Sequence, residues 1–80
     1  MSATPDRVLR SLGDSLPQHM ATEQQIRNAF SMAGYGPKKI DKWWNYYRNG
    51  TVGIILACTK DGRFMTNEDG KILYTTPFWM

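Results

Sequence analysis

The apolar residues of this 80-residue chain change their spacing at Gly50. Before Gly50 they recur at intervals of three and four, which places them on one face of an α-helix. After it, the nearly continuous apolar run Val52–Cys58 is rich in β-branched side chains and is typical of a buried strand. The change of period predicts an α+β fold in one small domain, residues 1–80, with helices first and strands second.

The first predicted helix is Pro5–Leu16. Thr4 is a good N-cap residue, and Pro5 suits the first helical position because its fixed φ is already helical. Pro17 ends the helix, since the residue before a proline is pushed out of helical geometry. Gly13 should weaken the helix interior by about 1 kcal/mol.

The second predicted helix is Glu23–Ala33, and a short glycine turn joins it to the third, Pro37–Asn49. Thr22 and Gln25 have the spacing of a capping box, in which each side chain satisfies a free backbone N–H of the first turn. Gly34 is a typical C-terminal stop. Because the turn is so short, the two helices must cross closely.

The third helix separates an apolar face from a polar one. Its apolar face carries Ile40, Trp43, Trp44 and Tyr47. At about 100° per residue, the opposite face holds Lys38, Lys42, Asn45 and Asn49. The spacing predicts a helix that packs its aromatic residues into the core, rather than using them to stack bases, and offers a basic, amide-bearing surface on its other side.

The formal net charge of +3 is concentrated on this same helix. Residues 36–50 contain Lys38, Lys39, Lys42 and Arg48 against Asp41, whereas the segments before and after them sum to zero. Such clustering favours a polyanionic partner more than the total charge does. The alternative is that these lysines only solvate an exposed helix face.

Three strands are expected in the second half. The run Val52–Cys58 is the first, Asp61-Gly62 is a strong hairpin turn, and Arg63–Thr66 is the second strand. A second turn at residues 67–70 leads into the third strand, Lys71–Thr75. This order predicts a three-stranded antiparallel meander that follows the three helices.

An apolar tail, Phe78, Trp79 and Met80, follows Pro77. It either folds back over the open edge or face of the sheet, which the thin core of so short a chain needs, or forms a protein-binding patch, since Trp and Met are enriched at interfaces. Both alternatives stay open from the sequence.

No set of residues predicts catalysis or metal binding. His19 is the only histidine and has no second ligand at zinc spacing, and turn formation explains Asp61 and Asp69, with Glu68 beside them. Cys58 is the only cysteine, typical of a buried, inert thiol in a reducing, cytoplasmic setting. We therefore expect no enzyme activity, no cofactor and, without an apolar run of about 20 residues, no membrane span.

The order of parts resembles the winged helix-turn-helix family, over the stretch from Val8 through Thr66. The resemblance rests on a leucine-bearing first helix, the segment Thr22-Glu23-Gln24-Gln25-Ile26-Arg27-Asn28-Ala29-Phe30, the turn at Gly34, a helix ending at Gly50, and an apolar strand that leads into Lys60-Asp61-Gly62-Arg63-Phe64. That family has no invariant motif, so the resemblance is architectural. The chain departs from it at Pro17–Ala21, which is too short and proline-broken for a first strand, and in its second turn at residues 67–70.

The resemblance implies a role for each polar element. The third helix would enter the major groove of duplex DNA, and the hairpin would touch the backbone or the minor groove. Lys38 and Lys42 would reach phosphates or guanine edges, and Asn45 would pair with adenine. Asn49 shares their face. The remaining nucleic-acid candidates are Lys60 and Arg63 in the hairpin and the phosphate-clamping Gln24 and Asn28 in the second helix.

The sequence thus favours a small DNA-binding regulator or accessory factor. A second hypothesis is a protein-binding module or inhibitor that occludes a partner enzyme through its aromatic tail and hairpin surface. The target DNA, the protein partner and the oligomeric state stay open.

Overall fold

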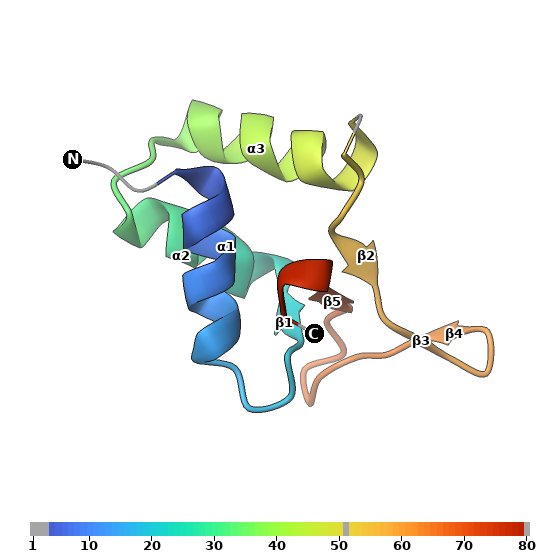
Figure 1. Cartoon of the computed structure of the whole chain (residues 1–80). Coiled ribbons are helices and arrows are strands. Elements are labelled where there is room, and N and C mark those ends of the chain that lie inside the picture. The colour runs from blue at the N-terminus through green and yellow to red at the C-terminus, as the bar shows by residue number, and fades with distance from the viewer. Residues whose placement is uncertain (1–3, 51, 80) are drawn as a thin grey trace.

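The computed structural model describes residues 4–50 and 52–79, which form three helices and a small antiparallel sheet (Figure 1). The helices are α1 (Pro5–Asp14), α2 (Glu23–Met32) and α3 (Pro37–Asn49). The α+β class is confirmed, and the bounds of α3 agree with the prediction. α1 and α2 end slightly earlier than predicted, because Ser15 and Ala33 serve as their C-caps.

The predicted N-caps of the first two helices are confirmed. The Thr4 hydroxyl accepts a hydrogen bond from the Arg7 backbone N–H at 3.3 Å. At α2 the capping box is complete: the Gln25 N–H donates to the Thr22 hydroxyl at 3.2 Å, and the Thr22 N–H donates to Gln25 Oε1 at 2.9 Å. These caps satisfy N–H groups that have no partner inside the helix.

The predicted three-stranded meander is wrong. Five short strands form two sheets: β1 (Ala21–Thr22), β2 (Leu56–Ala57), β3 (Thr59–Lys60), β4 (Arg63–Phe64) and β5 (Leu73–Thr75). One sheet has the order β1-β5-β2, and the other is the β3–β4 hairpin. β1 escaped prediction because a strand of two residues has no periodicity of its own, and only its pairing with β5 defines it.

The run Val52–Cys58 is also not the buried strand that its composition predicts. After α3 the chain turns at Gly53, with φ 54°, and the Ile55 N–H donates to the Tyr47 carbonyl at 3.0 Å. Only Ile55 is buried, whereas Leu56 is 55% exposed. The strand in this run is only Leu56–Ala57, and at the end of the sheet its free edge and the side chain of Leu56 both stay open to solvent.

Three backbone hydrogen bonds connect the two sheets. The Cys58 N–H donates to the Leu73 carbonyl at 2.8 Å, the Met65 N–H to the Cys58 carbonyl at 2.8 Å, and the Leu73 N–H to the Met65 carbonyl at 2.9 Å. The chain from Met65 to Leu73 forms the second predicted turn, in which the Asn67 side-chain oxygen accepts from the Asp69 and Lys71 N–H groups. Across this turn Thr66 pairs with Ile72 in an isolated antiparallel bridge, so the predicted meander is reduced here to single contacts outside the named strands.

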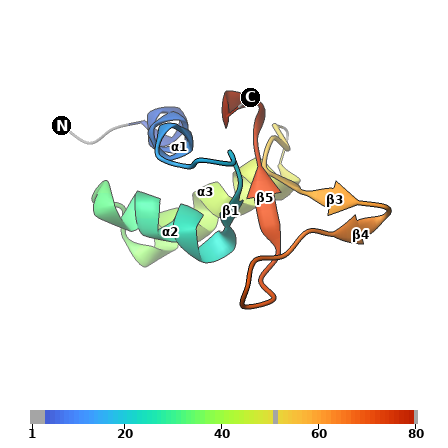
Figure 2. The same cartoon turned by 90° about the horizontal axis from the view of Figure 1, so that it is seen from below.

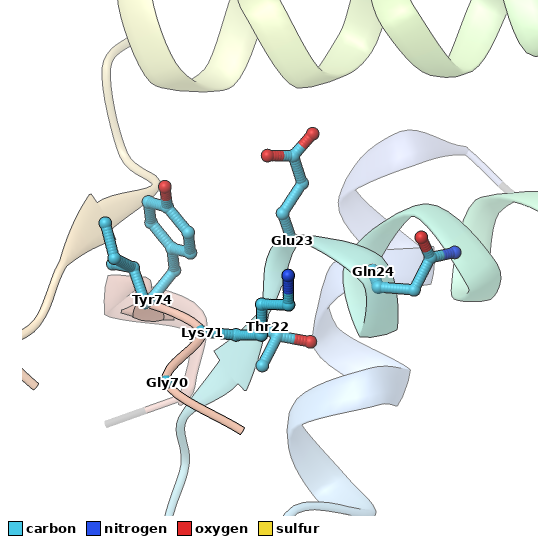
Figure 3. Close-up of a pocket in the computed structure, with 7 residues that line it drawn as sticks. Thr22, Glu23, Gln24, Gly70, Lys71 and Tyr74 are labelled. Atoms are coloured by element: carbon cyan, nitrogen blue, oxygen red, sulfur yellow. The ribbon is translucent and has the colours of Figure 1, made fainter. Parts of the chain in front are cut away.

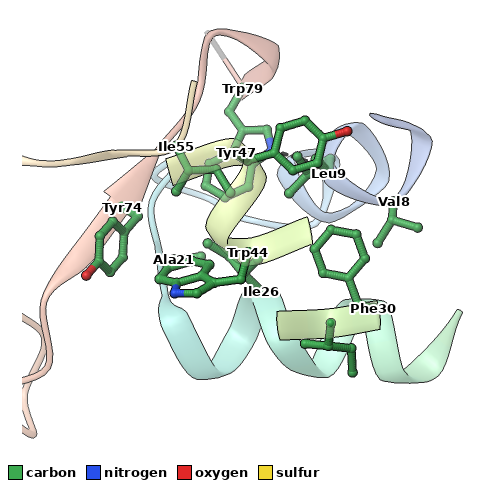
Figure 4. Packing of buried hydrophobic residues seen from close by; sticks show 11 residues of the cluster. Val8, Leu9, Ala21, Ile26, Phe30, Trp44, Tyr47, Ile55, Tyr74 and Trp79 are labelled. Atoms are coloured by element: carbon green, nitrogen blue, oxygen red, sulfur yellow. Dashed lines mark hydrogen bonds between the residues drawn. The ribbon is translucent and has the colours of Figure 1, made fainter. Parts of the chain in front are cut away.

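Tyr74 occupies the centre of the sheet that packs against the helices. It is paired with Ala21 on one side and with Ala57 on the other, and these small residues leave room for its ring. The ring meets Trp44 of α3 edge-on, with centroids 5.2 Å apart. The buried cluster around them contains Val8, Leu9, Ile26, Phe30, Ile40, Tyr47, Ile55 and Trp79 (Figure 4).

The apolar tail folds back onto α1 rather than over the sheet. It forms the 3-10 helix η1 (Pro77–Trp79), and the Trp79 indole N–H donates to the Leu9 carbonyl at 2.6 Å. The ring lies over Gly13, where an added Cβ would stand 2.1 Å from Trp79 Cδ1. Trp79 is 3% exposed and is therefore part of the core, so of the two alternatives for the tail this residue follows folding back and not the partner patch.

The other tail residues have different surroundings. Phe78 is half-buried under the Arg10 guanidinium, whose carbon lies 4.4 Å from the ring centroid. Met80, also predicted for partner binding, lies outside the described residues.

We expect Gly13→Ala to destabilise the chain when position 79 is Trp and to stabilise it when position 79 is Ala. In the native chain the new methyl group meets the Trp79 indole, so the free energy of unfolding should fall by about 1–3 kcal/mol. In a Trp79→Ala background the same substitution should raise it by up to about 1 kcal/mol, because alanine favours a helix interior over glycine. Denaturant unfolding of the four proteins in a stabilising osmolyte measures this coupling. Equal effects in both backgrounds would contradict the contact.

Candidate nucleic-acid interface

α3 turns its polar face to solvent and its aromatic face to the core. The predicted contact residues Lys38, Lys42, Asn45 and Asn49 are exposed, whereas Ile40, Trp44 and Tyr47 are buried. Trp43 is half-buried at one edge of the helix, and its ring centroid lies 5.4 Å from that of the exposed Tyr46. The two faces are therefore separate, and packing of α3 does not compete with its exposed surface.

The acidic residue of α3 is paired with a cation from α2. The Arg27 guanidinium donates to the Asp41 carboxylate at 2.5 Å and to Glu23 at 2.7 Å. The hydrogen bond to Asp41 is the main cause that raises the pKa of Arg27. Within the described residues, Lys38 and Lys42 form no ion pair. The Arg27 bridge therefore gives Asp41 a partner other than the two lysines and leaves both lysines available.

Two other contacts set the position of cations on α3. The Arg48 guanidinium carbon lies 5.3 Å from the Trp44 ring and 5.1 Å from the Tyr74 ring, which holds it beside the sheet. Lys42 Nζ lies 5.2 Å from the Trp43 ring. A cation–π contact at an exposed site is worth only about 0.5–1 kcal/mol, so that Lys42 can exchange it for a phosphate.

The predicted phosphate clamp of α2 lies beside the start of α3. Gln24 Nε2 donates to Asn28 Oδ1 at 2.8 Å, and both side chains are exposed. Together with Pro37 and Asp41 they line a groove of about 340 Å³ between α2 and α3. Their mutual bond leaves one Nε2 hydrogen of Gln24 and both amide hydrogens of Asn28 for other partners. The structure thus brings Gln24 and Asn28 close to α3.

Lys60 and Arg63 face each other across the β3–β4 hairpin. The turn between them has φ 54° at Asp61 and 76° at Gly62, which is the positive-φ turn predicted from the sequence. Both cations are exposed and have no ion pair among the described residues. Opposed like charges destabilise a strand pair, so this tip favours a bound anion.

The hairpin lies apart from α3. It projects away from the three helices, past the C-terminal end of α3, in both views (Figures 1 and 2). The structure thus places the predicted residues in two groups: one on α3 and α2, the other at the hairpin tip. A duplex that contacts both groups would have to extend from α3 to the tip of the hairpin.

A hollow of about 520 Å³ lies where the second turn approaches the start of α2 (Figure 3). It is lined by Thr22, Glu23 and Gln24 on one side and by Gly70, Lys71 and Tyr74 on the other. Its two charged groups have opposite sign, and the carboxylate of Glu23 already bonds Arg27. The hollow adds one cation, Lys71, next to the Gln24 clamp.

Within the described residues, no three His, Cys, Asp or Glu side chains are close enough to hold a metal ion. His19 is exposed, with φ 56°, and its carbonyl accepts a hydrogen bond from the Thr75 hydroxyl at 3.0 Å. Asp61, Glu68 and Asp69 are all exposed on the turns.

Sequence reasoning missed Arg27, which connects α2 to α3. Its spacing to Glu23 is that of a helical ion pair and is visible in the sequence. Its bond to Asp41 requires the helix crossing angle, which no local pattern gives.

Comparison of the chain with protein-family models, curated proteins and solved structures finds no match. None of the helices that the described residues form has the length and apolar character of a membrane span.

We expect Cys58 to be a slow nucleophile. Its side chain is half-buried, and burial raises the pKa of the thiol. The thiolate is the reactive form, so at pH 8 its alkylation by iodoacetamide should be slower, by about threefold or more, than in the urea-unfolded chain. Quenched mass spectrometry measures both rates. Equal rates would show that the fold does not protect this thiol.

Proposed function

We propose that this chain is a non-enzymatic, winged-helix-like protein that binds double-stranded DNA, as a small regulator or accessory factor. The polar face of α3 carries the proposal: Lys38, Lys42, Asn45 and Asn49 are exposed together on a helix whose opposite side is fixed in the core. A helix of this kind fits the major groove of B-DNA, where lysines can bond guanine or phosphate and asparagine can bond adenine.

The order of the elements supports the winged-helix part of the proposal. In that family a first strand falls between the first two helices, and β1 lies at this place and pairs with β5. β2 follows α3, and the β3–β4 hairpin lies between β2 and β5, as a wing would. In this reading Gln24, Asn28, Lys60 and Arg63 contact phosphates and position α3.

The affinity for duplex DNA should depend steeply on salt. If Lys38, Lys42, Lys60 and Arg63 each neutralise one phosphate, the logarithm of the association constant should fall against the logarithm of the salt concentration with a slope of about −4. Fluorescence anisotropy of a labelled duplex at several salt concentrations measures the slope. Absence of binding at low salt would overturn the proposal.

Lys38→Ala combined with Lys42→Ala should weaken binding about tenfold or more and should make the salt slope less steep by about 2. A matched control is Arg10→Gln combined with Gln18→Glu, which lowers the formal charge equally at exposed positions on α1 and in the loop after it. The control should bind nearly as the native chain does. Equal losses in the two double variants would mean that net charge, and not α3, determines the affinity.

Exposed apolar residues near the hairpin favour a second candidate, a protein-binding module. Leu56 is 55% exposed and Phe64 is 61% exposed, so neither side chain is used to build the core. Neighbouring exposed apolar side chains are typical of a contact surface. Capture of partners from a lysate with and without nuclease, using native chain and a Leu56→Ser, Phe64→Ser variant, separates the two functions. A single partner that survives nuclease and is lost with the variant favours this candidate. Deleting the tail is not a suitable test, because Trp79 belongs to the core.

A further inference from the structure

A groove between α1 and α2 belongs neither to the polar face of α3 nor to the hairpin. It has a volume of about 710 Å³. Figure 2 shows the two helices that form it, seen from the side away from α3. Apolar and small side chains line it: Val8, Leu12, Ala29 and Ala33. Met32 also lines it and is 89% exposed, the highest value among the exposed large hydrophobic residues described. An apolar groove with an exposed methionine is typical of a contact surface.

The rim of this groove carries two unpaired charges of opposite sign on α1. Arg7 and Asp14 both line the groove, both are exposed, and neither has an ion pair within the described residues. They stand two helical turns apart, and thus about 10 Å along the same side of the helix. Arg10, the other cation of the rim, is held over the Phe78 ring at 4.4 Å.

Both charges are placed against the dipole of their own helix. Arg7 lies in the first turn, where the dipole favours an anion, and Asp14 is the last residue, where it favours a cation. The stability of α1 therefore does not explain either of them. A binding partner that presents an anion near the start of α1 and a cation near its end does explain both.

We propose that this partner is α1 of a second copy of the chain, antiparallel to the first and related to it by a two-fold axis. Arg7 of one copy then faces Asp14 of the partner subunit, and the symmetric pair repeats the contact. A parallel arrangement would oppose like charges. The small residues Ser11, Ala29 and Ala33 let the helices approach, and Met32 of each copy covers the apolar groove of the other.

Sedimentation equilibrium of the full chain without DNA tests the dimer. Because the interface is small, the native chain should dimerise with a dissociation constant of about 10–100 µM. Arg7→Asp and Asp14→Arg each turn two attractive pairs into repulsive ones, so each should raise this constant at least about tenfold. Either substitution improves the charge pattern of α1 towards its own dipole, so a loss of dimer cannot be assigned to a weaker helix. Circular dichroism checks the helix content.

The two variants together provide the decisive measurement. When Arg7→Asp and Asp14→Arg chains are mixed, both pairs between position 7 and position 14 are attractive, so a heterodimer should form with nearly native affinity. The double variant Arg7→Asp, Asp14→Arg should also dimerise with itself. A native chain that stays monomeric up to about 1 mM, single variants that dimerise like the native chain, or a mixture that stays monomeric would each overturn the proposal. None of these outcomes depends on DNA binding by α3.

Discussion

The contact between the Trp79 indole and the backbone of Gly13 closes the core of this small chain. An 80-residue chain buries only about 60% of its unfolded surface, so one large ring has an unusual weight in it. The ring needs a residue without Cβ beneath it, and its N–H finds the Leu9 carbonyl. This contact holds η1 on α1, α1 packs on α2, and α2 packs on α3. The placement of α3 therefore depends on a pair of residues distant from it.

The exposed face of α3 is well positioned because the buried face is over-determined. Trp44 meets Tyr74 of the sheet, Tyr47 donates to the Asp6 carboxylate of α1 at 2.5 Å, and Arg27 bonds Asp41 from α2. Three different elements thus fix the rotation of one helix about its axis. Polar groups on a rigid element are held more precisely than groups on a loop. The lysine side chains can still change rotamer, but the backbone positions from which they extend are fixed by the packing of the helix.

What the sequence predicted correctly depends on near neighbours along the chain. The Thr22–Gln25 capping box, the bounds of α3 and the Asp61-Gly62 turn all follow from residues within a few positions of one another. The errors concern contacts between distant segments. β1 exists only because β5 pairs with it, and the run Val52–Cys58 is apolar although only Leu56–Ala57 of it forms a strand, at the edge of the sheet. The sequence predicts a weak point of α1 at Gly13, because no residue near it in the chain indicates the contact with Trp79. For the candidate site, the exposed positions on α3 were predictable, whereas the distance of the hairpin from α3 was not.

Three backbone hydrogen bonds, among Cys58, Met65 and Leu73, join the hairpin to the main sheet, whereas the hairpin strands themselves lie outside the core. On one side lies the β1-β5-β2 sheet, attached to the core through Tyr74; on the other lie β3 and β4, whose residues are all exposed. Local opening of such a segment costs far less free energy than global unfolding. The amide hydrogens of the hairpin should therefore exchange with solvent through a motion in which the core takes no part. The chain carries Lys60 and Arg63 on an arm that can change shape while the rest of the molecule keeps its own.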